Sequence, residues 1–309
     1  MIEPVCVQMR LACFSNTKTE SYGILEKATV IDLPLLAKVL GQSFPQTLDA
    51  LIQLEDMEEI RMARLLQSAT HEEIEKASLP IGKVKLLAPI KAPPKIVCLG
   101  LNYKDHAAEQ GVQPPDEPVI FMKPRTAIIG PNENIVKPSF VKQLDYEAEL
   151  AIVVGKRAKN VSIEDSEAHI FGYTVLNDVS ARDIQFKDRQ WTRGKSFDTF
   201  APTGPCVTLA EQIRDPTNLR VRTWVNQELR QNSTTGNMVF NSFQILHCLS
   251  RVMTLEACDL IATGTPAGVG FAMKPMPSFL QGGDIVEVDI EGIGLLRNSV
   301  VEERPAVHG

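Results

Sequence analysis

The sequence lacks several features that would place the protein in a broad class. No run approaches the ~18 consecutive apolar residues of a membrane-spanning helix, so we expect no membrane segment. No stretch is rich in Lys and Arg, and 32 basic against 38 acidic side chains give a formal charge of −6. A general nucleic-acid binder needs cations to neutralise phosphates, so this balance argues against one. The first residues also lack a basic segment followed by an apolar one, which argues against secretion.

The sequence also lacks the cysteine pattern of a disulfide framework. It has no CxxC pair among its six cysteines, which are Cys6, Cys13, Cys98, Cys206, Cys248 and Cys258. We expect reduced thiols, mostly buried, in an intracellular compartment, and none lies in a recognisable nucleophile motif. Hydrophobic residues make up 44% of the 309 residues. This is enough for a sizeable core, and the length predicts about two domains.

The first ninety residues differ in character from the rest. Residues 1–44 carry short apolar runs at 5–7, 22–25 and 28–33, broken by Asn, Gly and Pro, and are predicted to be β-rich. Apolar residues in 46–77 recur at spacings of three and four, which predicts an amphipathic helix in two or three pieces. The proline-rich stretch 86–94 forbids a continuous helix. We therefore predict a small N-terminal α/β domain over 1–90 and a larger domain over 91–309.

The larger region is predicted to be mostly strands. Runs rich in β-branched residues and bounded by Gly, Pro, Asn or Asp lie at 96–100, 119–123, 150–155, 173–178, 219–231, 259–264 and 284–301. One helix is predicted over 242–255, with Ile245, Leu246, Leu249, Val252 and Met253 on one side. Strands with only occasional helices favour an α+β, β-rich fold with a large mixed or antiparallel sheet system over alternating βαβ units.

A pair of acidic residues enters one of these strands. If the strand includes Glu147 and Glu149, both carboxylates project from the same face, because side chains alternate with a period of two. Burying both requires a neutralising partner, and carboxylate oxygens suit Mg²⁺, Ca²⁺ or Mn²⁺. The alternative is a solvated edge strand that exposes both acids.

Two further charged groups follow downstream. Asp178 ends an apolar strand, where a rigid scaffold often holds functional groups, although it is also suited to cap a short helix. Beyond it, Gly194 permits a tight backbone and Lys195 offers an ammonium to an anion or enolate. The alternative for Lys195 is a solvated loop position.

Two motifs flank this acidic region. If the segment after the strand at 96–100 is helical, His106 and Glu109 lie on one face, and the carboxylate then fixes the imidazole tautomer of a general base. The alternative is a weak surface contact. The glycines of GTPAGVG, at 264–270, allow backbone N–H groups to hold a carboxylate, or they form a simple tight loop. This loop lacks the Lys-Ser/Thr ending of a phosphate loop, which argues against nucleotide binding.

Together these motifs form a recognisable series. In chain order they are GLNYKDHAAE, FMKP, DYEAELAIVVGK, NDVSARDIQ, GKSFDTFAPTGP and GTPAGVG. In this order and spacing, from about residue 94 to residue 301, the chain resembles the fumarylacetoacetate hydrolase family. KDRQW, KSFDTF and the N-terminal segment resemble most the fumarylacetoacetate hydrolase domain-containing protein 2 branch.

The resemblance implies a structure and a set of site residues. It implies a mixed β-sandwich and roll, a homodimer, and bound Mg²⁺ or Mn²⁺, with Ca²⁺ also accepted. The implied metal ligands are Glu147, Glu149 and Asp178. The implied catalytic residues are His106, Glu109 and Lys195; the implied substrate-binding residues are Arg182, Gln185 and Thr265, and Thr199 is expected near the metal.

The resemblance also implies an activity. Keto acids of the oxaloacetate type chelate one hard cation, which stabilises an enolate. The branch favours keto–enol tautomerisation of oxaloacetate. The alternatives are an acylpyruvate C–C bond hydrolase, an oxaloacetate decarboxylase, and a catalytically idle metal-binding protein. Mitochondrial residence is implied by the branch, with the cytoplasm as the alternative.

Overall fold

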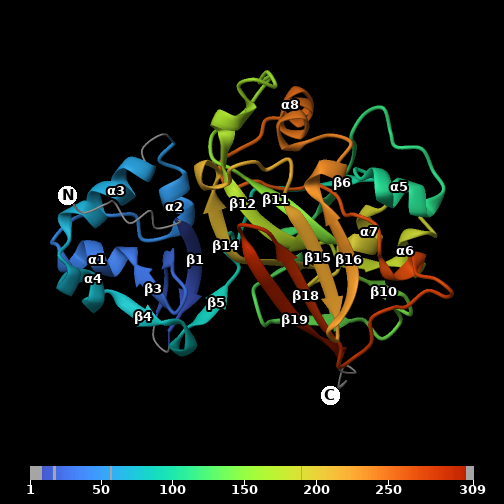
Figure 1. The fold of residues 1–309 in the computed structure, drawn as a ribbon, viewed down its shortest axis with the longest axis horizontal. Helices are drawn as coiled ribbons and strands as arrows, with labels where there is room; N and C mark the ends of the chain where they lie inside the picture. Colours follow the sequence, from blue (N-terminus) through green and yellow to red (C-terminus); the bar gives the residue numbers. More distant parts are fainter. Residues whose placement is uncertain (1–8, 17–18, 56–57, 189, 304–309) are drawn as a thin grey trace, which may run out of the picture.

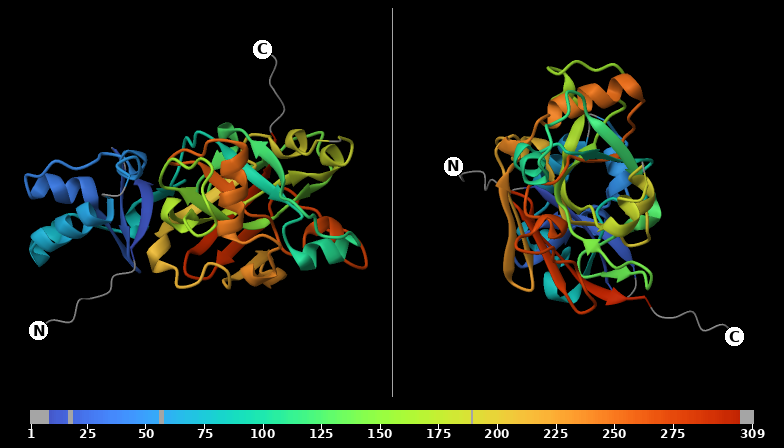
Figure 2. Two further views of the ribbon diagram at one scale, coloured as in Figure 1. Left: turned by 90° about the horizontal axis from the view of Figure 1, so that it is seen from above. Right: turned by 90° about the vertical axis from the view of Figure 1, so that its right-hand side faces the viewer.

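The N-terminal part of the chain consists of short strands and helices at one end of the molecule (Figures 1 and 2). The computed structural model describes residues 9–16, 19–55, 58–188 and 190–303. The N-terminal strands are β1 Arg10–Ser15, β2 Glu20–Leu25, β3 Thr29–Asp32, β4 Ser78–Pro80 and β5 Lys85–Leu87. The helices are α1 Leu33–Val39, α2 Leu48–Ile52, α3 Glu58–Ser68 and α4 His71–Lys76. The predicted helix over 46–77 is thus confirmed in three pieces, whereas the run at 5–7 lies outside the described residues.

Helix α1 was not expected from the apolar run at 28–33. Its N-cap is Asp32, whose side chain accepts a hydrogen bond of 2.9 Å from the Leu35 backbone N–H, and Pro34 lies in the first turn. Both features favour a helix start. The strand therefore ends at Asp32, and Leu33 begins the helix.

A 12-stranded mixed sheet runs through the molecule (Figure 1). The strands that follow the N-terminal part are β6 Ile96–Gly100, β7 Val119–Lys123, β8 Ile128–Ile129, β11 Ala148–Val154, β12 Ile170–Asn177, β14 Ala201–Leu209 and β17 Leu260–Ala262. The order is β4-β3-β2-β1-β14-β12-β11-β17-β6-β7, with β5 paired to β1 and β8 paired to β14. Among the described strands of this sheet, β17–β6 and β14–β8 are the parallel pairs.

A second, five-stranded sheet has the order β16-β15-β18-β19-β9. Its strands are β9 Asn134–Lys137, β15 Arg220–Val225, β16 Glu228–Thr234, β18 Ile285–Ile290 and β19 Gly294–Glu302. Strands β10 Leu144–Asp145 and β13 Ser180–Ala181 form a separate antiparallel pair. The predictions for 219–231 and 284–301 correspond to the hairpins β15–β16 and β18–β19.

Helix α8, Ser242–Val252, corrects one detail of the predicted apolar face. Ile245, Leu246 and Leu249 are buried, as expected. Val252 is 69% exposed and Met253 is the C-cap, with extended backbone. Val252 therefore points away from the core, whereas Met253 packs against the core from just beyond the end of the helix.

The central strand β11 is buried on both faces. Leu150 and Ile152 belong to one hydrophobic core, which also contains side chains of the five-stranded sheet and α8. Ala151 and Val153 belong to a second core, shared with the N-terminal strands and helices. The period-two alternation of a strand explains this division. Glu149 therefore shares the face of Ala151.

The architecture confirms the α+β, β-rich fold class. The division of the chain near residue 90 stays a prediction, because the large sheet continues from β1 directly into β14. Across the described residues, every helix is too short or too polar to cross a membrane. Cys13, Cys98, Cys206 and Cys258 are buried free thiols, Cys248 is partly exposed, and Cys6 lies outside the described residues.

Candidate metal centre

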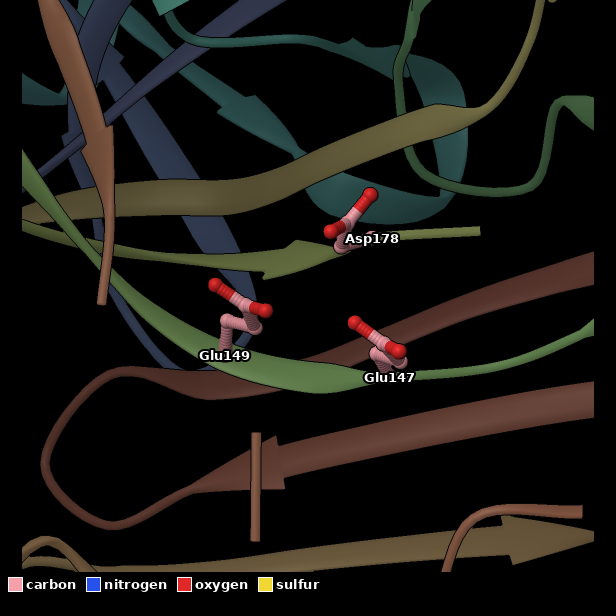
Figure 3. A group of neighbouring side chains, drawn as sticks. All are labelled: Glu147, Glu149 and Asp178. Carbon is pink, nitrogen blue, oxygen red and sulfur yellow. The ribbon is translucent and has the colours of Figure 1, made fainter. Parts of the chain in front are cut away.

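Three carboxylates meet where strands β11 and β12 run side by side (Figure 3). Ala148 lies opposite Asn177 in this antiparallel pair, so Glu147 and Asp178 are adjacent just outside it. The Asp178 backbone N–H donates to the Glu147 carbonyl at 2.9 Å. Glu147 precedes β11 and does not lie in it, which corrects the strand boundary. One ligand oxygen from each of Glu147, Glu149 and Asp178 lies within 4.8 Å of the others.

Glu149 is the least compensated of these acids. Its side chain is fully buried, and Oε2 accepts a hydrogen bond of 2.7 Å from the Gly264 N–H. Its Oε1 is buried and has no hydrogen-bond partner among the described residues. Burial, and then the charges of Asp178 and Glu147, raise its pKa well above the usual range. A buried oxygen without a partner, beside two other carboxylates, fits a hard divalent cation.

Two buried ammonium groups balance part of this negative charge. Lys195 Nζ donates to Asp178 Oδ2 at 2.6 Å, to Glu147 Oε2 at 2.8 Å and to Ser180 Oγ at 2.9 Å. Lys123 Nζ donates to Asp178 Oδ1 at 2.5 Å. Burial lowers the pKa of Lys195, but Asp178 and Glu147 raise it further, so that it ends above its ordinary value. The predicted Lys195 therefore lies within the acidic cluster.

Arg182 connects the cluster to the neighbouring loop. Its Nη1 lies 2.7 Å from Glu147 Oε1 and 2.9 Å from Gln185 Oε1, and its Nε donates to Asp145 Oδ2 at 2.8 Å. Its Nη2 is buried, and no hydrogen-bond partner for it lies in the part of the chain that the structure describes. Burial acts to raise the pKa of Glu147, but Lys195 and Arg182 lower it to about 2. Glu147 is thus held as a carboxylate.

Helix α5, Lys104–Gln110, carries the predicted histidine and glutamate. His106 Nδ1 lies 2.6 Å from Glu109 Oε1, which confirms the expected contact on one helix face. His106 Nε2 lies 2.8 Å from the side-chain nitrogen of Gln110. Both ring nitrogens are therefore engaged by residues of the same helix.

The loop after β17 fixes the acidic side chains through its backbone. Gly264 N–H donates to Glu149 at 2.7 Å, Gly268 N–H to Glu109 at 3.0 Å and Gly270 N–H to Asp145 at 2.7 Å. The sequence left two interpretations of this loop open, and in the structure its N–H groups hold carboxylates of the protein's own side chains. At Gly268, φ is +102°, and a Cβ would lie 2.2 Å from the Arg230 carbonyl oxygen. Glycine is therefore required for the close approach there.

A cavity opens beside the carboxylates. The predicted residues that line it are His106, Glu147, Arg182, Gln185, Lys195 and Thr265. Its apolar walls include Leu99, Leu101, Phe121, Phe186, Trp191 and Phe271. Thr199 is not part of its lining, and its Oγ1 accepts a hydrogen bond of 2.9 Å from the Val136 N–H. Polar groups that converge within apolar walls are typical of a small-molecule site.

Three residues of this site had no role assigned from sequence. Lys123 is the third residue of the FMKP motif but contacts an acid 55 residues away, which no local pattern reveals. Asp145 begins the DYEAE motif and holds Arg182. Gln110 follows His106 at the i,i+4 spacing of a helix face, and that spacing is the one signal that points to it.

Comparison with known proteins agrees with this geometry. Residues 95–301 match the family described as fumarylacetoacetate (FAA) hydrolase, C-terminal. The chain belongs to the fumarylacetoacetate hydrolase family. The match spans the strands, helix α5 and the loop that build the site.

Relatives and solved structures of this family share most of the chain. The mitochondrial oxaloacetate tautomerase FAHD2B of Bos taurus is 47% identical over 72% of this chain and 71% of its own. The fumarylacetoacetate hydrolase domain-containing protein 2 homologue of Dictyostelium discoideum is 46% identical over 74% and 77%. Maleylpyruvate hydrolase from Sphingobium sp. SYK-6, solved with manganese(II) and pyruvate, is 30% identical. Its TM-score is 0.75, over 96% of this chain and all of that one. The resemblance to the fumarylacetoacetate hydrolase domain-containing protein 2 branch is thereby confirmed.

Proposed function

We propose that this protein is a divalent-metal-dependent enzyme that catalyses the keto–enol tautomerisation of oxaloacetate. The observation that carries the proposal is the convergence of Glu147, Glu149 and Asp178 beside a cavity that also presents Lys195 and Arg182. Relatives that share 72% of the chain are named oxaloacetate tautomerases. A catalytically idle metal-binding protein would keep the same carboxylates, but the cavity that Lys195 and Arg182 line beside them favours an enzyme.

The proposed metal ligands are Glu147, Glu149 and Asp178. When bound there, Mg²⁺ or Mn²⁺ supplies a Lewis acid that stabilises negative charge on keto-acid oxygens. The chain supplies fixed positive charge of its own. Lys195 contacts Glu147 and Asp178, Arg182 contacts Glu147, and both basic side chains line the cavity. Their positive charges are therefore held in place before substrate binds.

Tautomerisation asks little else of the protein. The enol oxygen loses a proton, carbon 3 gains one, and no water is consumed. Lys195 and Arg182 stabilise the oxygen as its negative charge grows, because they are held in place and do not reorganise. The walls formed by Phe121, Trp191 and Phe271 exclude water and strengthen these electrostatic interactions.

The test is the rate at which enol-oxaloacetate loses its enol absorbance. Protein with Mg²⁺ should accelerate this loss beyond buffer and metal alone, and EDTA should remove the acceleration. Asp178→Asn should be inactive, whereas Glu164→Gln, an exposed acid outside the cavity, should match the wild type. An unaccelerated decay with the metal-loaded wild type would falsify the proposal.

A second candidate function is acylpyruvate hydrolysis, which the His106–Glu109 contact of 2.6 Å favours as a means of activating water. It predicts that acetylpyruvate yields acetate and pyruvate and that His106→Ala stops this. Decarboxylation of oxaloacetate predicts pyruvate and CO₂ without acetate. Product identification on both substrates separates the three reactions.

The proposal extends to assembly and compartment. Strand β7 is the outer strand of the large sheet, and its Val119, Ile120 and Met122 are each about two-fifths exposed. An apolar edge of this kind supports a homodimer. Light scattering should give twice the mass of one chain, which is 34.1 kDa.

The relatives named as mitochondrial proteins support residence in that organelle, which cell fractionation tests.

A further inference from the structure

The lone pair that His106 would use as a base is already occupied. Nδ1 lies 2.6 Å from Glu109 Oε1, and a carboxylate oxygen only accepts, so Nδ1 carries the proton. The lone pair of the neutral imidazole is then at Nε2. The side-chain nitrogen of Gln110 lies 2.8 Å from Nε2, and an amide nitrogen only donates. Gln110 therefore engages the one basic atom of the ring.

The surroundings hold this arrangement in place. His106 and Gln110 are four residues apart on α5, so both side chains lie on one helix face, and both line the cavity. Glu109 Oε2 accepts a hydrogen bond of 3.0 Å from the Gly268 N–H. Glu109 is thus held from the side opposite His106, and the ring keeps Nε2 directed at Gln110.

This contact bears differently on the two candidate reactions. In hydrolysis of an acylpyruvate, His106 Nε2 takes a proton from water while the water oxygen bonds to the acyl carbon. The C–C bond then breaks, its electron pair leaves with the pyruvate fragment, and a proton converts that fragment to pyruvate beside the released acid. A base must have its lone pair free for the first transfer. Ketonisation of enol-oxaloacetate consumes no water and does not need that transfer.

We infer that Gln110 is a positioning residue that keeps His106 from activating water and so selects tautomerisation over hydrolysis. The inference rests on the proposed tautomerase function and deepens it. It assigns to one side chain the choice between two reactions that share a metal centre and a cavity.

The test compares two reactions in one set of variants. Gln110→Met keeps the side-chain length and a high helix propensity but removes the donor. With Mg²⁺ present, the ratio of kcat for pyruvate release from acetylpyruvate to kcat for ketonisation should rise at least about tenfold, which corresponds to ~1.4 kcal/mol of activation free energy. KM for acetylpyruvate should change much less. Gln110→Ala should also raise the ratio of the two kcat values.

Two controls separate this role from a loosening of the helix. Gln113→Met makes the same exchange at an exposed position three residues further on, and it should keep the wild-type ratio. Adding His106→Ala to Gln110→Met should abolish the gain, since the freed lone pair belongs to His106. A structural defect alone would lower both rates together.

The outcomes are distinguishable. A wild type that accelerates ketonisation, with unchanged ratios in both Gln110 variants, overturns the inference and leaves the proposed function standing. Equal losses of both activities, or a gain that survives His106→Ala, also overturn it. A wild type without ketonisation activity overturns the proposed function itself.

Discussion

Lys195 Nζ lies 2.6 Å from Asp178 Oδ2, and both side chains are almost fully buried. The same ammonium also contacts Glu147. Before any metal binds, the candidate metal centre therefore already contains a cation supplied by the chain. The carboxylates are buried and partly neutralised before a metal ion binds, which distinguishes this site from an exposed acidic surface.

Removal of this ammonium should be costly in the metal-free protein. Lys195→Met breaks the buried ion pairs of this ammonium and leaves one oxygen of Asp178 and one of Glu147 without their cation, for an expected loss of about 3–5 kcal/mol in unfolding free energy. Saturating Mg²⁺ should recover part of this loss, because a dication replaces the missing charge. Urea denaturation with EDTA and with Mg²⁺ measures both values. Lys83→Met, at an exposed position, should stay within about 0.5 kcal/mol of the wild type. An equal loss in both media would contradict this account.

Two isosteric ligand variants should differ in the sign of their effect on metal-free stability. Burial and the acidic neighbours of Glu149 raise the pKa of its carboxyl group, so its charged form is destabilising, and Glu149→Gln should raise the melting temperature in EDTA. Asp178→Asn loses its ion pairs with Lys195 and Lys123, so the melting temperature of that variant in EDTA should fall. Both variants should weaken Mn²⁺ binding in calorimetry by at least about 100-fold, more than the loss of a supporting hydrogen bond causes. Parallel stability changes in the two variants would argue against the charge distribution described.

The corrected face of α8 gives a matched pair of packing variants. Leu249 is 1% exposed and Val252 is 69% exposed on the same helix. Leu249→Ala should cost about 2–5 kcal/mol of unfolding free energy, because it leaves a cavity in the core. Val252→Ala should remain within about 0.5 kcal/mol of the wild type. Urea titration of both variants checks the boundary of the helix, and comparable losses would place Val252 in the core.

The buried thiols should resist modification well into alkaline pH. Burial raises the pKa of Cys13 and Cys258 to about 12 and that of Cys206 to about 11. A raised pKa keeps a thiol protonated at pH 9, where an ordinary cysteine is half ionised and reactive. In native protein at pH 8 to 9, Ellman's reagent should leave these three unmodified and react at partly exposed Cys248. All six should react in urea, and fast native labelling of Cys13 would contradict the structure.

The candidate site was predictable where local pattern decides it. The spacing of Glu147 and Glu149 and the strand end at Asp178 are visible in the sequence, and the antiparallel register then brings them together. The contact of Lys123 with Asp178 joins segments 55 residues apart. Such contacts depend on strand order, which periodicity does not encode.

The fold shows the same division between local and long-range information. Strands β6 and β7 begin and end at the predicted residues. Strand β14 was not predicted, because Pro202, Gly204 and Pro205 resemble a loop. The pairing of β12 with β14 shifts register between Tyr173 and Val175, and this irregularity accommodates those residues within the sheet.

The pairing of β1 with β14 has a practical consequence for anyone who shortens this protein. In the large sheet β14 lies between β12 and β1, where Leu11 is opposite Val207. A truncated chain that starts at residue 91 would strip β1 away and uncover backbone donors and acceptors along β14. An exposed edge strand with unpaired backbone groups can pair with strands of other chains. Aggregation of such a fragment would reflect its missing neighbour, and a soluble version needs β1 restored or β14 shielded.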